Sequence, residues 1–199
     1  MEYVGADKLF ATHVARYKLP EIVDELTEVY DHYDADDSLW DYNQTFNVHV
    51  LDEHKTLQDK IVAVAKDWLL DRLKYNCDVQ MTTSWLTRTP AELYGANVHT
   101  HHNSWWSGVY YLHDECALQI DSTLYSMNNI DIPHKEFSLD TAISAVYEMN
   151  KGEILLFPSQ TPHMVIKKKN KKYKHVRRSI AFNLLPKGKI GNADSSWVY

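Results

Sequence analysis

Hydrophobic positions recur every three or four residues in two segments of the first half of the chain, and this spacing predicts two amphipathic helices. The first follows Pro20 in PEIVDELTEVYDHY, with apolar positions at Ile22, Val23, Leu26, Val29 and Tyr30. The second covers about residues 55–74, with apolar positions at Leu57, Ile61, Val64, Ala65, Trp68, Leu69 and Leu73. Before the first helix, LFATHVARYKLP alternates loosely and predicts an edge strand, while TFNVHVLD between the helices is a candidate short strand.

After Cys77 the pattern changes to short extended runs rich in β-branched and aromatic residues. Turn formers separate them, and the runs read MTTSWLTRT, NVHTHH, WWSGVYYL, ALQIDS, AISAVYEM, EILLFPS, HMVIKK and RSIAFNLL. So many short strands predict a sandwich or jelly roll, with the helices packed on one sheet. We therefore expect a single, mainly β domain: a helical support region at 1–76, a jelly-roll core at 77–186 and a tail at 187–199.

The composition fits this expectation, because 199 residues that are 44% hydrophobic can form one substantial core. The chain has no apolar run of membrane-spanning length, and MEYVGADKLFATHV lacks the features of a secretory signal. We therefore expect a cytoplasmic protein with no membrane contact. The two cysteines, Cys77 and Cys116, are far apart, which argues against a disulfide framework and against a thiolate zinc site. A metal would need nitrogen and oxygen ligands.

Charge is distributed unevenly along the chain. The net charge is −6, but residues 167–178, KKKNKKYKHVRR, contain eight Lys or Arg and leave 13 basic against 27 acidic residues elsewhere. The favoured interpretation of this basic run is a solvated turn that keeps a hairpin soluble, and the alternative is a contact with an acidic partner. The acidic remainder makes nucleic acid the least favoured partner.

Three histidines directly precede the run WWSGVYYL, in the stretch NVHTHHNS. On a strand, residues i and i+2 share a face, so His99 and His101 would point one way and His102 the other. A third ligand must come from elsewhere, and His163 in FPSQTPHMV is the strongest candidate. Imidazole suits iron, zinc, copper or nickel, and facial ligands beside open positions are typical of non-haem Fe(II) oxygenases. The alternative is an ordinary polar loop.

The stretch RRSIAFN, further along the chain, supplies a candidate clamp for an acidic ligand. Arg177 and Ser179 stand at i and i+2 on a predicted strand, so both would face the interior. A guanidinium fork suits a carboxylate, and a metal beside such a clamp indicates an acidic cosubstrate. Arg178 is the alternative clamp, although strand parity with Ser179 favours Arg177. A surface position for Arg177, beside the lysines, is the other interpretation.

Three stretches in this order, HTHHNSWWSGVYYL, KGEILLFPSQTPHMV and RRSIAFNLLPKG, resemble a family of 2-oxoglutarate and Fe(II)-dependent oxygenases of bacteria and phages. Its members read approximately HxHPxSxxSGVYY, GxLxxFPSxxxHxV and RxSIxFN, and LFATHVARYKLP is similar to their N-terminal strand. The resemblance implies a double-stranded β-helix, a cupin-like jelly-roll barrel with the metal near its open end. It also implies Fe(II), with 2-oxoglutarate and O2 converted to CO2 and succinate while an unidentified substrate is hydroxylated.

The resemblance assigns roles to five residues: His99, His101 and His163 as metal ligands, and Arg177 with Ser179 around the far carboxylate of 2-oxoglutarate. Two departures matter. His102 replaces the family's proline and is a rival ligand, and a histidine stands where the wider superfamily has aspartate, which leaves three neutral ligands. Asp121 in ALQIDS is a substitute carboxylate, although a structural or substrate-side role suits it better.

Tyr110 and Tyr111 are neighbours on a predicted strand, so one of them would point into the barrel and could donate its hydroxyl to 2-oxoglutarate. The sequence does not decide which one. Two competing functions remain at this stage. One is a cupin-like three-histidine metalloenzyme that does not use 2-oxoglutarate, and the other is a non-catalytic jelly-roll binding protein.

Overall fold

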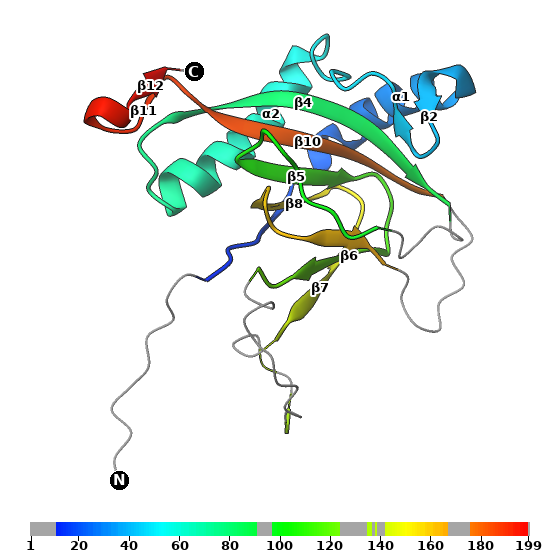
Figure 1. Cartoon of the computed structure of the whole chain (residues 1–199). Helices are drawn as coiled ribbons and strands as arrows, with labels where there is room; N and C mark the ends of the chain where they lie inside the picture. The colour runs from blue at the N-terminus through cyan, green and yellow to red at the C-terminus, as the bar shows by residue number, and fades with distance from the viewer. Residues whose placement is uncertain are drawn as a thin grey trace.

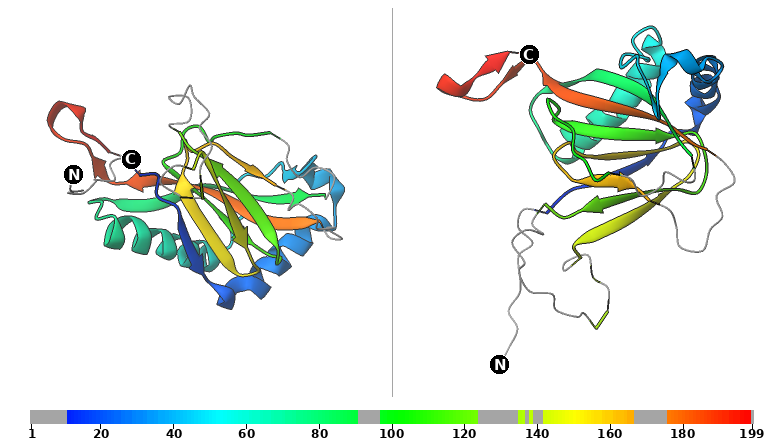
Figure 2. Two further views of the ribbon diagram at one scale, coloured as in Figure 1. Left: turned by 90° about the horizontal axis from the view of Figure 1, so that it is seen from below. Right: turned by 45° about the vertical axis from the view of Figure 1, so that its right-hand side comes forward.

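The computed structural model describes residues 11–90, 97–123, 135–136, 138, 142–166 and 176–198. Two antiparallel β-sheets lie face to face, and two helices cover the outer face of the larger sheet (Figures 1 and 2). This arrangement confirms the predicted mainly β fold with helices packed on one sheet. The basic residues 167–175 lie outside the described part of the chain.

The larger sheet has seven strands. Their spatial order is β1 (Ala15–Lys18), β8 (Glu153–Pro158), β5 (Trp106–Tyr111), β10 (Arg177–Lys187), β4 (Asp78–Thr89), β3 (Gln44–Thr45) and β2 (Trp40–Asp41). The predicted edge strand near the N-terminus is therefore confirmed as β1. The candidate strand TFNVHVLD is mostly wrong, because only Thr45 of it lies in a strand, and a bridge from His49 to Ser84 is its remaining sheet contact.

The smaller sheet consists of β7 (Ser144–Met149), β6 (Cys116–Asp121) and β9 (His163–Val165). A C-terminal hairpin of β11 (Lys189–Ile190) and β12 (Trp197–Val198) projects from the body, as Figure 1 shows. Seven of the eight runs predicted after Cys77 form strands. The eighth, NVHTHH, is a loop that joins the sheet through one bridge, from His99 to His163.

The two predicted helices are α1 (Val23–Asp34) and α2 (Lys55–Lys66). The second continues as a π-helical segment, Asp67–Arg72, so its predicted extent is nearly right. Their buried faces pack on outward-facing residues of the large sheet and form the outer core, which includes Leu26, Tyr30, Ile61, Leu86, Tyr110 and Ile180. None of the helices in the described segments has the length and apolar character needed to cross a membrane.

A second, inner core fills the space between the sheets. It contains Val109, Tyr111, Cys116, Leu118, Ile120, Met149, Leu155, Phe157 and Ala181. Successive strand residues point to opposite faces, so β5, β8 and β10 alternate between the two cores. This alternation is why all six residues of β5 are buried although only every second one faces the inner space.

Gly108 is the position where β5 and β10 pack most closely. It lies opposite Phe182, and a Cβ atom added to it would overlap the Phe182 ring and lie 2.8 Å from Leu156 Cδ2. Only glycine leaves space for the aromatic ring at this point of the outer core.

We therefore expect Gly108→Ala to lower the free energy of unfolding by about 1–3 kcal/mol, the usual cost of overpacking a core. Urea denaturation would measure the loss. In a Phe182→Leu background the same substitution should cost less, because the smaller side chain leaves room for the methyl group. Equal stability of Gly108→Ala and the wild-type chain would contradict this account of the packing.

Candidate metal centre and cosubstrate pocket

His99, His101 and His163 converge at one end of the inner space. The main chains of His99 and His163 exchange two hydrogen bonds of 3.1 and 3.0 Å, and the His101 amide donates to the Ser159 carbonyl at 2.9 Å. The ring centroids are 4.3 to 5.5 Å apart. One ring nitrogen from each residue lies within 4.8 Å of the others, so the three imidazoles can converge on a single ion.

Each of these rings has its Nδ1 atom next to a hydrogen-bond acceptor. His99 Nδ1 is 3.1 Å from the Asn97 carbonyl, His163 Nδ1 is 2.9 Å from the Thr161 carbonyl, and His101 Nδ1 is 2.7 Å from Asn183 Oδ1. An acceptor at Nδ1 holds the proton there and leaves the Nε2 lone pair free. Metal-binding histidines are held in this way by their outer partners.

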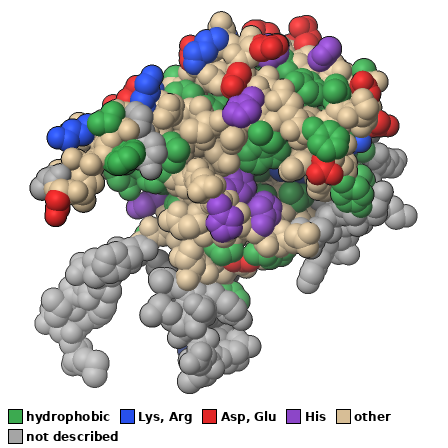
Figure 3. Space-filling view, turned by 45° about the horizontal axis from the view of Figure 1, so that its top comes forward, with side chains coloured by type: hydrophobic (Ala, Val, Ile, Leu, Met, Phe, Trp, Pro, Cys, Tyr) green, Lys and Arg blue, Asp and Glu red, His purple; other side chains and the backbone are tan. Residues whose placement is uncertain are grey.

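Burial keeps two of the three imidazoles neutral. Desolvation lowers the pKa of His163 to about 4, although its hydrogen bond to Thr161 opposes the shift. Desolvation also lowers the pKa of His101, and the neighbouring His99 adds to this effect. His99 itself is exposed, and Figure 3 shows histidine side chains grouped at the surface among hydrophobic and uncharged ones. Neutral rings are the form that binds a metal.

The two alternative ligands lie outside this group. His102 is exposed and is not a member of the cluster. Asp121 ends β6 one residue after Ile120, which lies directly opposite His163, so its side chain points to the other face of the small sheet. There it accepts a hydrogen bond of 2.7 Å from Gln119 Nε2. Within the described residues, no carboxylate joins the three histidines.

Arg177 is the most unusual charged residue of the inner space. It begins β10, is only 4% exposed, and its guanidinium lies 5.2 Å from the centroid of the Tyr111 ring. Within the described residues, no carboxylate forms an ion pair with it, and its Nε atom has no hydrogen-bond acceptor. Burying a guanidinium without an ion-pair partner lowers the stability of the fold unless an anion binds to it.

Tyr111 is the tyrosine that faces the inner space. Among the described residues its buried hydroxyl has no hydrogen-bond partner, and burial raises its pKa to about 12, so the phenol keeps its proton at neutral pH. Tyr110 points into the outer core and donates to the Leu19 carbonyl at 2.8 Å. Ser179 lies between Tyr111 and Thr87 in the sheet, and its hydroxyl is 2.7 Å from Thr87 Oγ1.

Arg178 has a different environment from its neighbour. Its guanidinium donates to Asp31 at 2.9 Å and to Asp34 at 2.7 Å, and it lies over the Tyr30 ring. These contacts attach the start of β10 to α1, on the outer face of the large sheet. The alternative clamp therefore faces away from the inner space and already has two carboxylate partners.

Three residues at the site were not found from the sequence: Asn183, Ser107 and Trp85. Asn183 and Ser107 contact His101 Nδ1, and the Trp85 ring centroid lies 5.5 Å from that of His101. Strand parity could have found Asn183, because residues 177, 179, 181 and 183 share a face. No local pattern places Ser107 or Trp85 beside a histidine that lies in a loop.

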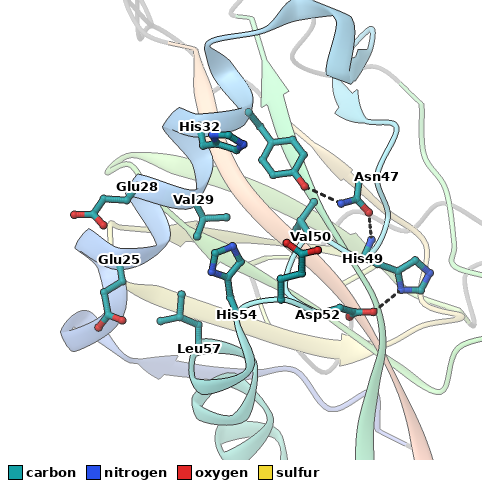
Figure 4. Close-up of a pocket in the computed structure, with 12 residues that line it drawn as sticks. Glu25, Glu28, Val29, His32, Asn47, His49, Val50, Asp52, His54 and Leu57 are labelled. Atoms are coloured by element: carbon teal, nitrogen blue, oxygen red, sulfur yellow. Dashed lines mark hydrogen bonds and ion pairs between the residues drawn. The ribbon is translucent and has the colours of Figure 1, made fainter.

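A separate cavity of about 690 Å³ lies on the helix side, between α1 and the segment leading into α2 (Figure 4). Its lining includes three histidines and four carboxylates, His32, His49, His54, Glu25, Glu28, Asp52 and Glu53. His49 Nδ1 is paired with Asp52 at 3.2 Å. Within the described residues, the side chains that lie close enough together to share a metal ion are His99, His101 and His163, and not those that line this cavity.

The donor set of the inner space fits Fe(II) and 2-oxoglutarate. Three convergent imidazoles suit a transition metal of intermediate softness. Arg177 Nε and the Tyr111 hydroxyl, which have no partner in the part of the chain that the structure describes, are hydrogen-bond donors in the same inner space, and they suit a carboxylate.

The sequence matches one family model. The family is described as "Putative 2OG-Fe(II) oxygenase", and its model covers residues 83–183, just over half of the chain. The match includes the stretches that contain His99, His101, His163, Arg177 and Ser179. No curated protein sequence matches the chain.

Solved structures share the fold at low sequence identity. AviO1 from Streptomyces viridochromogenes Tue57 has a TM-score of 0.57 and 13% identity, over 87% of this chain and 89% of that one. SnoK, a non-heme alpha ketoglutarate dependent carbocyclase from nogalamycin biosynthesis, has a TM-score of 0.60 and 10% identity, over 87% of this chain and 80% of that one. HygX from Streptomyces hygroscopicus, with nickel, 2-oxoglutarate and hygromycin B bound, has a TM-score of 0.55 and 14% identity, over 88% of this chain and 83% of that one.

The structural neighbours confirm the jelly-roll fold, and the family model confirms the resemblance seen in the sequence. This chain therefore belongs to the family of 2-oxoglutarate and Fe(II)-dependent oxygenases, whose metal is Fe(II) and whose cosubstrates are 2-oxoglutarate and O2.

Proposed function

We propose that this oxygenase is a hydroxylase in which His99, His101 and His163 hold Fe(II) through their Nε2 atoms and Arg177 holds the far carboxylate of 2-oxoglutarate. The observation that carries the proposal is the pairing of two features in one inner space. Three imidazoles converge with Nδ1 engaged, and a buried guanidinium there has no ion-pair partner among the described residues. Fe(II) with 2-oxoglutarate would supply the oxidising chemistry, in which 2-oxoglutarate and O2 become succinate and CO2.

The residues of the chain would bind and orient. Arg177 and the Tyr111 hydroxyl donate hydrogen bonds to the far carboxylate, and the Ser179 hydroxyl, beside Thr87, offers a third polar contact. The apolar side chains of the inner core around them would exclude water from the bound carboxylate. Oxidation would take place at the histidines, of which His99 is exposed.

The absence of a carboxylate among the three ligands is the feature that favours a second candidate, the cupin-like metalloenzyme that does not use 2-oxoglutarate. Arg177 argues against it, because no carboxylate among the described residues compensates this buried guanidinium and such an enzyme would bring no anionic cosubstrate. The non-catalytic binding protein leaves both the imidazole cluster and Arg177 without a role. We therefore place the 2-oxoglutarate-dependent hydroxylase first.

The prime substrate is not assigned by the fold. SnoK is described as a carbocyclase and HygX was crystallised with hygromycin B, so related barrels serve different substrates. We propose the cytoplasm as the site of action, because both cysteines are free and a reducing compartment preserves thiols and Fe(II). Nucleic acid remains the least favoured substrate class on charge grounds.

The first test is an anaerobic titration of metal-free protein with Fe(II) and then with 2-oxoglutarate. We expect a visible charge-transfer band when the keto acid chelates the iron. Arg177→Met should weaken 2-oxoglutarate binding by roughly tenfold or more, since hydrogen bonds to a charged group contribute about 1.5–3 kcal/mol. Iron binding should persist, because Arg177 is not a ligand.

Arg178→Met is the matched control for this titration. It removes the contacts with Asp31 and Asp34, so it should lower the melting temperature without changing 2-oxoglutarate affinity. Arg177→Met should not lower the melting temperature of the ligand-free protein, because it removes a buried charge that no described carboxylate pairs with. If Arg177→Met loses iron and 2-oxoglutarate together, Arg177 is a structural residue and the clamp assignment is wrong.

The ligand assignment has its own test. Replacing His163 with Ala should abolish or weaken Fe(II) binding by at least tenfold, as should replacing His101, whereas His102→Ala should bind Fe(II) like the wild-type chain. Isothermal titration under anaerobic conditions would give the affinities. A loss of affinity in His102→Ala equal to that in His101→Ala would overturn the assignment of His101.

A further inference from the structure

Polar side chains of three strands form a hydrogen-bonded group beside the His101 ring. Its Nδ1 atom lies 2.7 Å from Asn183 Oδ1 on β10 and 2.9 Å from Ser107 Oγ on β5. Ser107 Oγ also donates to Asn183 Oδ1 at 2.8 Å, and Asn183 Nδ2 donates to Thr83 Oγ1 on β4 at 3.0 Å. The other two histidines differ, because their Nδ1 atoms face main-chain carbonyls.

The Asn183 amide lies between Thr83 and His101. Its NH2 group donates to Thr83 Oγ1, and its carbonyl oxygen faces His101. A carbonyl oxygen cannot donate, so His101 carries its proton on Nδ1, which leaves the Nε2 lone pair free to bind a metal. The amide thus sets both the tautomer and the direction of the ring.

Three serine side chains link this group to the loop that contains His101. Ser107 Oγ lies 2.8 Å from Ser159 Oγ, and Ser159 donates to Ser104 Oγ at 2.7 Å. The Ser159 carbonyl also accepts from the His101 amide at 2.9 Å. The ring of His101 therefore contacts β5 and β10, and its backbone bonds to Ser159 directly after β8, although His101 lies outside any strand.

We propose that Asn183 is a positioning residue for the metal centre, which fixes His101 in the Nδ1-protonated form and directs its Nε2 atom at the ion. The inference rests on the proposed function of His101 as a ligand. The role matters more here than in a site that contains a carboxylate ligand, since the donors found among the described residues are three neutral imidazoles, whose basicity depends on the groups that bond to Nδ1. A carboxylate in place of the amide would strengthen the hydrogen bond from Nδ1 and make Nε2 a stronger donor to the metal.

The test compares Asn183→Ala and Asn183→Asp with the wild-type chain by titrating metal-free protein with Co(II). We expect Asn183→Ala to bind Co(II) 10- to 100-fold more weakly, the usual effect of removing such an outer partner. Asn183→Asp should bind at least as tightly as wild type, and the visible Co(II) spectrum should shift in both variants because the donor strength of His101 changes. The melting temperature of each metal-free variant reports folding separately.

Ser84→Ala is the control, because Ser84 is buried on β4 but faces the opposite side, where its hydroxyl accepts from the Leu51 amide. It should leave Co(II) affinity and spectrum unchanged. If Asn183→Ala does not fold, Thr83→Val replaces it, since that change removes the group that orients the amide and should also weaken Co(II) binding.

Two results would overturn the inference alone. One is wild-type Co(II) affinity in Asn183→Ala, or in Thr83→Val where that variant is used. The other is an equal loss of affinity in Asn183→Ala and Asn183→Asp, which would mean that Asn183 only supports the fold. A wild-type chain that binds no Co(II) would overturn the proposed function first, and the inference with it.

Discussion

The alternation of side chains along β5 and β10 is the constraint on which the rest of the structure depends. The large sheet separates a helix-packed outer core from an inner space, so neighbouring residues of the same type have different environments. Arg178 pairs with α1 while Arg177 lies buried between the sheets, and Tyr110 packs under the helices while Tyr111 faces the guanidinium. A register slip of one residue would exchange every such pair, so the site exists only in one register.

Two features of the sheet hold that register. Gly108 and Phe182 are complementary in shape, and no other alignment of β5 on β10 would place a missing side chain against the aromatic ring. The pairing of β10 with β4 also shifts between Asn183 and Leu184, where Thr82 is the extra residue in β4. Bulges of this kind are common next to active sites, and this one follows directly after the Asn183 and Thr83 pair.

The sequence predicted which histidines lie close together better than it predicted their local structure. His99 and His101 were expected on one face of a strand; they do share a cluster, but in a loop that meets the sheet at a single bridge. Positive φ angles at Asn97 and Asn103 flank this loop, and no hydrophobic period could indicate them. Alternation did predict the inward direction of Arg177 and Ser179, because they lie in a long regular strand.

The supporting contacts could not be predicted in the same way, because they join segments that are distant in the chain. Ser107 and Asn183 are 76 residues apart, and they meet at His101 only because β5 and β10 are neighbours in the sheet. Strand order is set by how the whole chain buries its apolar faces, and a local pattern does not contain it. The extent of the second helix was nearly right, but its change from α to π at Asp67 had no signal in the spacing of its apolar residues.

Charge gives the inner space a clear preference among ligands. Within the described residues, three neutral imidazoles and one unpaired guanidinium define the site, and no carboxylate joins the histidine cluster. A divalent ion at the histidines would add to the positive charge of Arg177 rather than cancel it. The ligand that best compensates the metal ion and Arg177 is a dianion with one carboxylate at the metal and the other at the guanidinium. 2-Oxoglutarate is such a dianion. In the proposed site, three histidine ligands would therefore make charge balance depend more on the cosubstrate than it would in a site with an aspartate ligand.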